Sequence, residues 1–167
     1  FKPSEINSGY LFKRVDLKDS PIIEADVQYV VDTQRGTNLE KNGIKIQTCE
    51  HVLSALVGLQ IDNCIIELDS SEPPIMDGSS KFFVEAIESA GVIEQDVIRD
   101  EYIVTEPISY KDEKSGSDIT VIPAENYKLI TYKKDGSLAT VDLGTFKNIH
   151  TVFPSCLLYT SDAAYEE

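Results

Sequence analysis

The chain contains 167 residues, of which 15 are Lys or Arg and 29 are Asp or Glu, and its formal net charge is −14. This charge argues against a nucleic-acid-binding protein, because contacts with a phosphate backbone need a stripe of Lys and Arg that the sequence does not show. No apolar run approaches the roughly 20 residues of a membrane-spanning helix, and no stretch resembles a signal peptide. We therefore expect a cytoplasmic protein with no transmembrane segment and no nucleic-acid partner.

The cysteines are widely spaced and show no C-x-x-C pattern, so the sequence supports neither a zinc ribbon nor a disulfide scaffold. They are Cys49, Cys64 and Cys156. Free thiols of this kind favour a reducing compartment. The chain begins at Phe1 rather than at a methionine, so we expect the natural N-terminus to lie further upstream.

The first 47 residues are predicted to form short strands, because β-branched and aromatic residues alternate there between polar turns. The predicted strands are Tyr10–Val15, Asp26–Val31, Thr37–Lys41 and Ile44–Gln47. The last two flank Asn42 and Gly43, a pair that tolerates positive φ and strongly favours a β-hairpin.

Two amphipathic helices are predicted after these strands. Thr48 is expected to cap the first, whose apolar residues recur at helical spacing; these are Val52, Leu53, Leu56 and Leu59. The apolar strand Cys64–Leu68 and a Pro-rich loop follow. Ser79 or Ser80 can cap the second helix, and Gly91 is its expected end. Its apolar face is formed by Phe83, Val84, Ile87 and Ala90.

A charged linker over residues 94–101 precedes a second set of predicted strands. These are Tyr102–Val104, Ile108–Tyr110, Ile119–Ile122 and Lys128–Tyr132. Strands followed by grouped helices indicate an α+β fold rather than a parallel βαβ array. We expect a sheet with two helices on one face, followed by the opening strands of a second, similar domain.

The densest group of chemically useful side chains is Glu50 and His51, in the first turn of the first predicted helix. Adjacent helical residues point about 100° apart, so they would not chelate one ion together. One could bind a metal while the other stands beside the metal's water. The local sequence leaves a plainer interpretation open, in which both are polar residues at a helix start.

Other candidates have favoured structural interpretations. Cys49 could be a thiol nucleophile with His51 as its base, but residues i and i+2 of a helix do not face each other, so a buried structural cysteine is preferred. Asp77 could be catalytic, but a turn that leads into the second helix is the preferred role. His150 has no assigned place.

Two segments together resemble one family. Residues 46–63 read IQTCEHVLSALVGLQIDN and residues 73–84 read PPIMDGSSKFFV. In order and spacing they resemble the core motifs of the bacterial UDP-3-O-acyl-N-acetylglucosamine deacetylases, which are zinc amidases of lipid A biosynthesis. The resemblance runs from Phe1 to about Tyr132.

This resemblance implies that His51 is a zinc ligand and that Glu50 is the general base. It implies UDP-3-O-acyl-N-acetylglucosamine as the substrate, with acetate and UDP-3-O-acyl-glucosamine as products, and a site between two α+β domains. The chemistry is consistent, because Zn²⁺ lowers the pKa of its water to about 7. Asp32 and residues 36–37 match the edge of the family's site, although many members carry Cys where Gly36 stands.

The sequence also departs from the family. The family's other two zinc ligands form a His-x-x-x-Asp pair in the second domain, whereas His150 is followed four residues later by Pro154. We therefore expect an N-terminal fragment that is inactive by itself. Its expected parts are a first domain over residues 1–97, the start of a second over 98–132, and an unaligned tail over 133–167. Residues 155–164 resemble translated sequencing-adapter DNA, so we expect this tail to be an artefact.

Two alternatives stay open. The chain could be a non-catalytic α+β module that keeps the Glu-His pair, or the deacetylase half of a fusion with a hydroxyacyl-carrier-protein dehydratase. Substrate-binding residues are not assigned by the sequence. If the chain itself held zinc and were active, the first ligands to test would be Asp32, Cys49, Asp77 and His150.

Overall fold

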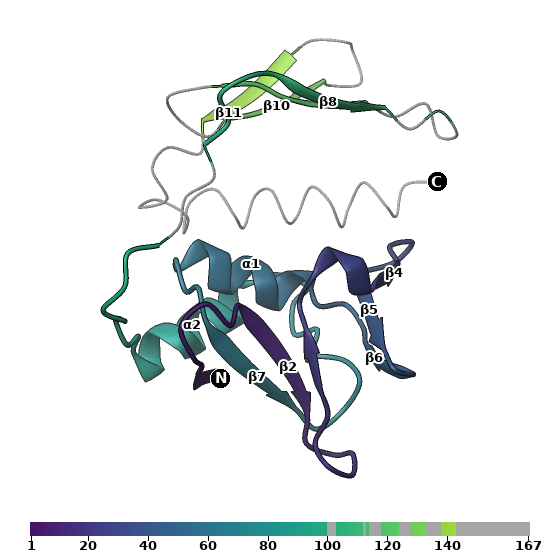
Figure 1. The fold of residues 1–167 in the computed structure, drawn as a ribbon, viewed down its shortest axis with the longest axis vertical. Coiled ribbons are helices and arrows are strands. Elements are labelled where there is room, and N and C mark those ends of the chain that lie inside the picture. Colours follow the sequence, from purple (N-terminus) through teal and green to yellow (C-terminus); the bar gives the residue numbers. More distant parts are fainter. Residues whose placement is uncertain (100–102, 112, 114–117, 124–127, 133–137, 143–167) are drawn as a thin grey trace. The chain divides into compact units, whose positions relative to one another are not determined.

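The computed structural model describes residues 1–99, 103–111, 113, 118–123, 128–132 and 138–142 (Figure 1). The described residues belong to two compact units, one formed by residues 1–95 and the other by residues within 96–148. The first unit contains both helices and the Glu-His motif, and the second contains strands.

The larger sheet of the first unit has four strands in the order β1-β7-β2-β3. These strands are β1 (Lys2–Pro3), β2 (Tyr10–Arg14), β3 (Ile22–Glu24) and β7 (Cys64–Leu68). β7 runs parallel to β2 and antiparallel to β1, while β3 runs antiparallel to β2. The predicted strands at Tyr10 and Cys64 are therefore confirmed, whereas β3 was not predicted.

A smaller antiparallel sheet contains β4 (Val30–Asp32), β5 (Asn38–Lys41) and β6 (Ile44–Ile46). The turn between β5 and β6 has positive φ at both central residues, 53° at Asn42 and 78° at Gly43. This is the backbone geometry that an Asn-Gly hairpin requires, so the predicted hairpin is confirmed.

The predicted strand Asp26–Val31 is wrong in its first half. A short 3₁₀ helix, η1 (Val27–Tyr29), stands there, and the strand begins only at Val30. The cause is local, because Asp26 accepts a hydrogen bond from the main-chain N–H of Gln28 at 3.0 Å. Such a side-chain bond offers the backbone an alternative to pairing in a sheet.

Helices α1 (Glu50–Gly58) and α2 (Lys81–Ala90) lie on the same side of the β2–β7 sheet (Figure 1). Their apolar faces and the covered face of the sheet form one core. Phe12 and Ile66 are register partners in this sheet, and both are buried with Leu56 of α1 and Ile87 of α2. The α+β architecture with two helices on one face of a sheet is therefore confirmed.

The predicted cap of α1 is wrong, whereas the prediction that Ser79 or Ser80 caps α2 is confirmed, because Ser80 is its N-cap and the Lys81 N–H donates to the Ser79 hydroxyl oxygen. Cys49, not Thr48, occupies the N-cap of α1, and it makes no side-chain capping bond. Thr48 instead has φ of 50°, and its hydroxyl donates to Glu72. Ser80 occupies the N-cap of α2, but its hydroxyl donates to the carbonyl oxygen of His51 at 2.8 Å. The predicted stop of α2 is confirmed, since Gly91 follows it with φ of 84°.

The second unit contains two antiparallel pairs, β8 (Ile108–Lys111) with β9 (Asp118–Val121) and β10 (Lys128–Tyr132) with β11 (Leu138–Asp142). Three of its predicted strands are found, and β11 was not predicted. The remaining predicted strand, Tyr102–Val104, is wrong where the structure describes it, because residues 103–104 have no regular structure.

Most of the predicted tail, including residues 143–167, lies outside the described residues. Among the residues that the structure describes, no helix combines the length and apolar composition that crossing a membrane requires.

Candidate functional site

The short segment between β6 and α1 is hydrogen-bonded to Thr37, the residue before β5. After β6, the main-chain N–H of Cys49 donates to the carbonyl oxygen of Thr37 at 3.2 Å. The same oxygen accepts a bond from the Cys49 thiol, also at 3.2 Å. These bonds fix the first turn of α1 against the start of β5, and Glu50 and His51 lie in that turn.

The Glu50 carboxylate is held by one of its two oxygens. Oε2 accepts a hydrogen bond from the main-chain N–H of Thr37 at 2.8 Å. Oε1 lies 3.9 Å from Nε2 of His51, which is too far for a hydrogen bond. The side chain is about one-third exposed, and the N-terminus of α1 favours its negative charge. Glu50 is therefore oriented by the protein, with an accepting oxygen beside the imidazole.

The imidazole of His51 is mostly buried, with a side-chain exposure of 14%. Its Nδ1 atom is buried, and no described residue gives it a hydrogen bond. A buried polar nitrogen normally has a partner, and leaving it without one costs roughly 1–3 kcal/mol. An imidazole nitrogen of this kind suits a metal ion, so the residue fits the role of a zinc ligand.

The Cys49 thiol is unsuited to nucleophilic attack. The residue is fully buried, and this burial, with the nearby charge of Glu50, raises the pKa of the thiol to about 11. At neutral pH the group is a protonated thiol, whereas nucleophiles are thiolates. The geometry agrees with the structural interpretation of this cysteine.

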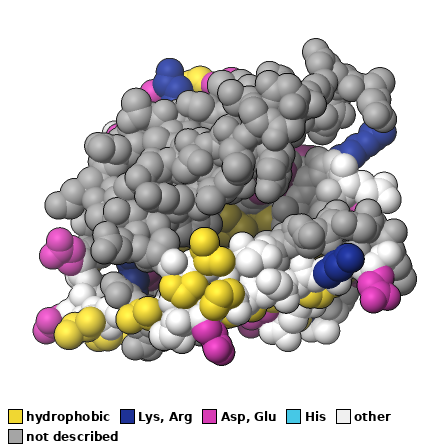
Figure 2. Space-filling view, turned by 90° about the horizontal axis from the view of Figure 1, so that it is seen from above, with side chains coloured by type: hydrophobic (Ala, Val, Ile, Leu, Met, Phe, Trp, Pro, Cys, Tyr) yellow, Lys and Arg dark blue, Asp and Glu magenta, His cyan; other side chains and the backbone are white. Residues whose placement is uncertain are grey.

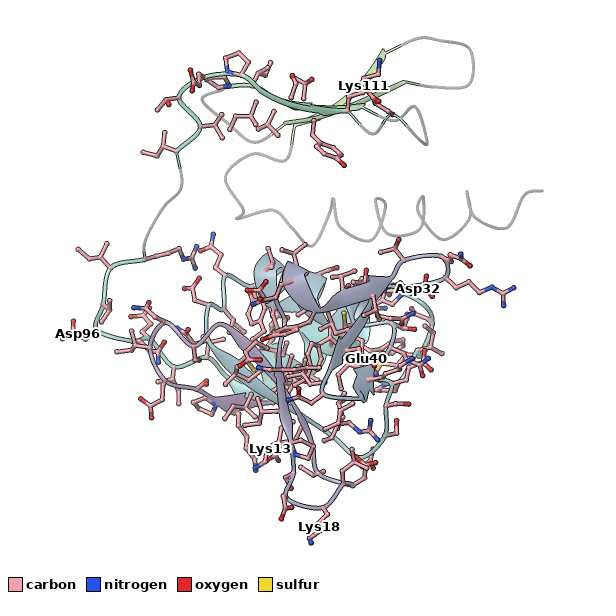
Figure 3. All side chains as sticks on the ribbon, turned by 45° about the vertical axis from the view of Figure 1, so that its right-hand side comes forward. Lys13, Lys18, Asp32, Glu40, Asp96 and Lys111 are labelled. Carbon is pink, nitrogen blue, oxygen red and sulfur yellow. The ribbon has the colours of Figure 1, made fainter. Side chains whose placement is uncertain are left out.

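The remaining candidates lie in turns. Asp32, at the end of β4 (Figure 3), accepts from the main-chain N–H of Gln34 at 3.1 Å. Asp77 accepts both the main-chain N–H and the hydroxyl of Ser79, at 3.0 and 2.8 Å, and these bonds lower the pKa of its carboxyl group. Asp77 therefore forms the turn before α2. His150 lies outside the described residues.

The described part of the chain does not bring these candidates together. Within it, no group of three His, Cys, Asp or Glu side chains is arranged to hold a metal ion. His51 is thus one candidate ligand, with Glu50 beside it.

Apolar side chains are exposed near this region. Ile75, Met76 and Phe82 are 54%, 47% and 42% exposed, and Met76, Asp77 and Phe82 line an open pocket. Hydrophobic side chains with acidic ones among them are also visible at the surface in Figure 2.

Three contacts of the site were not anticipated from the sequence. They are the bond from the Thr37 N–H to Glu50, the bond from Ser80 to His51, and the bond from Thr48 to Glu72. Sequence assigned Ser80 and Thr48 only to helix capping. All three depend on loops folding back to α1, which local residue patterns do not encode.

Comparison with known proteins gives a consistent result. Residues 1–147 match the family described as UDP-3-O-acyl N-acetylglycosamine deacetylase (LpxC). The chain is 40% identical over 151 residues to the bifunctional enzyme LpxC/FabZ of Bacteroides thetaiotaomicron, covering 90% of the chain and 33% of that protein. It is 45% identical over 129 residues to the enzyme of the same name from Chlorobaculum tepidum, an alignment that covers 77% of the chain and 28% of that protein.

A third relative is the UDP-3-O-acyl-N-acetylglucosamine deacetylase of Xanthomonas campestris pv. campestris, which is 42% identical over 129 residues. That alignment covers 77% of the chain and 42% of the relative. The chain thus spans between about a quarter and two-fifths of the length of these curated relatives.

Proposed function

Because the chain belongs to the UDP-3-O-acyl N-acetylglycosamine deacetylase family, we propose that the protein carrying these residues hydrolyses the acetamide of UDP-3-O-acyl-N-acetylglucosamine. The products would be acetate and UDP-3-O-acyl-glucosamine, in lipid A biosynthesis. The observation that carries this proposal is the pairing of an oriented Glu50 with a buried, unpartnered nitrogen of His51 in the matched segment.

Glu50 is proposed as the general base. The Thr37 N–H holds Oε2, so Oε1 accepts the proton of the attacking water. As the water oxygen adds to the acetamide carbonyl, Glu50 retains this proton, and the C–N bond then breaks as an acid from outside the described residues donates a proton to the sugar amine. The fixed orientation of Glu50 places the accepting oxygen before the substrate arrives.

His51 is proposed to hold Zn²⁺ through a ring nitrogen. Bound zinc supplies Lewis-acid polarisation and a water of lowered pKa. Catalytic zinc sites normally use three protein ligands. We propose that His51 is one of them and that the others come from residues outside the described part. Because the described residues supply one such ligand and His150 is not followed by the family's Asp, we expect the 167-residue chain alone not to release acetate.

The test is acetate release from UDP-3-O-acyl-N-acetylglucosamine by the protein expressed from its complete gene. Activity should be lost after treatment with a chelator and restored by stoichiometric Zn²⁺. A complete protein that releases no acetate would overturn the proposed reaction. Activity that survives demonstrated removal of all metal would overturn the zinc assignment while leaving the reaction in place.

A second candidate is that the deacetylase is fused to another enzyme. It is favoured by the two bifunctional LpxC/FabZ relatives, at 40% and 45% identity. The sequence of the complete gene tests it, because a fusion requires a second catalytic domain downstream of the deacetylase. A stop codon directly after the deacetylase region would exclude it.

The location of the protein is proposed to be the cytoplasm. Two described cysteines, Cys49 and Cys64, are free and buried, as expected in a reducing compartment. Fractionation of cells that express the complete protein tests this assignment.

A further inference from the structure

The residue two positions before Glu50 has an unusual backbone conformation. Thr48 has φ of 50°, in the left-handed region. A β-branched residue rarely adopts this conformation, and such strain persists only where the surrounding structure fixes it. The strained residue leads directly into the first turn of α1, so whatever holds it also sets the direction in which Glu50 leaves the backbone.

Two hydrogen bonds hold Thr48, one to its main chain and one to its side chain. Its N–H donates to Oδ1 of Asn38 at 3.2 Å. Its hydroxyl donates to Oε1 of Glu72 at 2.6 Å, a short bond to a carboxylate. Gly36 packs on Thr48 as well, since a Cβ there would lie 3.1 Å from the Thr48 hydroxyl oxygen and 3.3 Å from Oε1 of Glu50.

Glu72 is exposed, and hydrogen bonds to Ser70 hold its main chain. Its N–H donates to the Ser70 hydroxyl oxygen at 3.2 Å, and that hydroxyl donates to the Glu72 carbonyl oxygen at 2.8 Å. The neighbouring Ser71 carbonyl oxygen accepts from the N–H of Gln47 at 2.8 Å, and Pro73 is buried. The loop after β7 is therefore fastened alongside the end of β6, and the Glu72 carboxylate extends from it to Thr48.

We infer that Glu72 is a positioning residue for Glu50, acting through the hydroxyl of Thr48. The bond keeps Thr48 in its left-handed conformation, and this conformation orients the first turn of α1 so that Glu50 meets the Thr37 N–H. This inference rests on the proposed function, in which Glu50 is the general base. Glu72 thereby acts on the deacetylase site through Thr48, since none of its hydrogen bonds described above is to Glu50 or His51.

The test compares five variants of the complete protein with its wild type, the fifth being Thr48→Ser, which keeps the hydroxyl. Glu72→Ala removes the acceptor, Thr48→Val removes the hydroxyl but keeps the branched shape, and the double variant removes both. Glu67→Ala is the matched control, because it removes a carboxylate that pairs with Lys2 at 2.7 Å in the sheet. Two readouts are measured, the kinetics of acetate release and the hydrogen exchange of the Thr37 amide.

Glu72→Ala and Thr48→Val should each lower kcat about tenfold and change KM less than about twofold. The reason is that each change misplaces the general base without weakening the binding of the substrate. The double variant should match the single variants, since both changes break one bond. Thr37 exchange should accelerate in all three variants, while Glu67→Ala leaves both readouts unchanged. Thr48→Ser, which keeps the hydroxyl, should retain near-wild-type kinetics and Thr37 protection.

Additive losses in the double variant, or a Glu72→Ala protein with unchanged kcat and Thr37 exchange, would overturn the inference. If the wild type releases no acetate, the proposed function fails, but the Thr37 exchange still tests the link from Glu72 to Glu50. The two failures are therefore distinguishable.

Discussion

The packing of α1 gives a prediction whose size follows from the structure. Leu56 is fully buried at the centre of the core that α1 shares with the sheet. Leu56→Ala removes three buried carbon atoms, a transfer loss of about 2.4 kcal/mol at roughly 0.8 kcal/mol per methylene. Because the cavity left behind adds to this loss, we expect a total destabilisation of about 3–4 kcal/mol.

The adjacent residue provides the control. Val57 lies in the same helix but is 42% exposed, so Val57→Ala should change stability by less than about 0.5 kcal/mol. Native-state hydrogen exchange of the β7 amides is the assay, because it reports the opening of the first unit separately from the second. If Leu56→Ala cost less than about 1 kcal/mol, or no more than Val57→Ala, the assignment of this helix face to the core would be wrong.

Three further predictions follow from individual side chains. Iodoacetamide should not label Cys49 in the folded protein at pH 8, because the residue is fully buried and the pKa of its thiol is about 11. It should label Cys49 after denaturation, and mass spectrometry of the labelled peptides checks both expectations. Gly43→Val should destabilise the first unit by roughly 1–2 kcal/mol, because φ is 78° at this position. Lys45→Val, at an exposed position of β6, should not destabilise it, and hydrogen exchange of the β5 amides measures both effects. Hydrogen bonds from Ser79 lower the pKa of Asp77, so the stability that Asp77 contributes is complete above its ordinary pKa of 3.8 and is lost as the pH falls through the lowered value. Asp77→Asn should therefore flatten this loss in acid-unfolding curves. An unchanged curve would contradict the role of Asp77 in the turn.

The regular elements with strong local patterns were predictable from the sequence. The Asn42-Gly43 hairpin, strand β7 and the apolar faces of both helices all follow from short-range spacing and turn chemistry, except that Ala90, predicted on the apolar face of α2, is exposed. The 3₁₀ helix η1 was missed because the bond that Asp26 accepts from the Gln28 N–H outweighs the β-propensity of the residues after Asp26. Strand β3 is three residues long, and no turn signal such as the Asn42-Gly43 pair before the equally short β6 marks it in the sequence.

The candidate site was predictable only in part, for a similar reason. Glu50 and His51 stand together in a recognisable motif, and the structure places both in the first turn of α1. What orients them comes from elsewhere in the chain: Thr37 lies 13 residues before Glu50, and Ser80 lies 29 residues after His51. Contacts across such separations depend on how loops return to the helix, and residue periodicity does not specify that path.

The central claim is that Glu50 acts as the base while His51 binds the metal. The most direct measurement is acetate release by the complete protein, with bound zinc quantified in the same samples, for wild type, Glu50→Gln and His51→Ala. We expect Glu50→Gln to lose activity by a factor of about 10² or more while keeping its zinc, and His51→Ala to lose both. A Glu50→Gln protein with wild-type kcat, or a His51→Ala protein with undiminished zinc and activity, would contradict it.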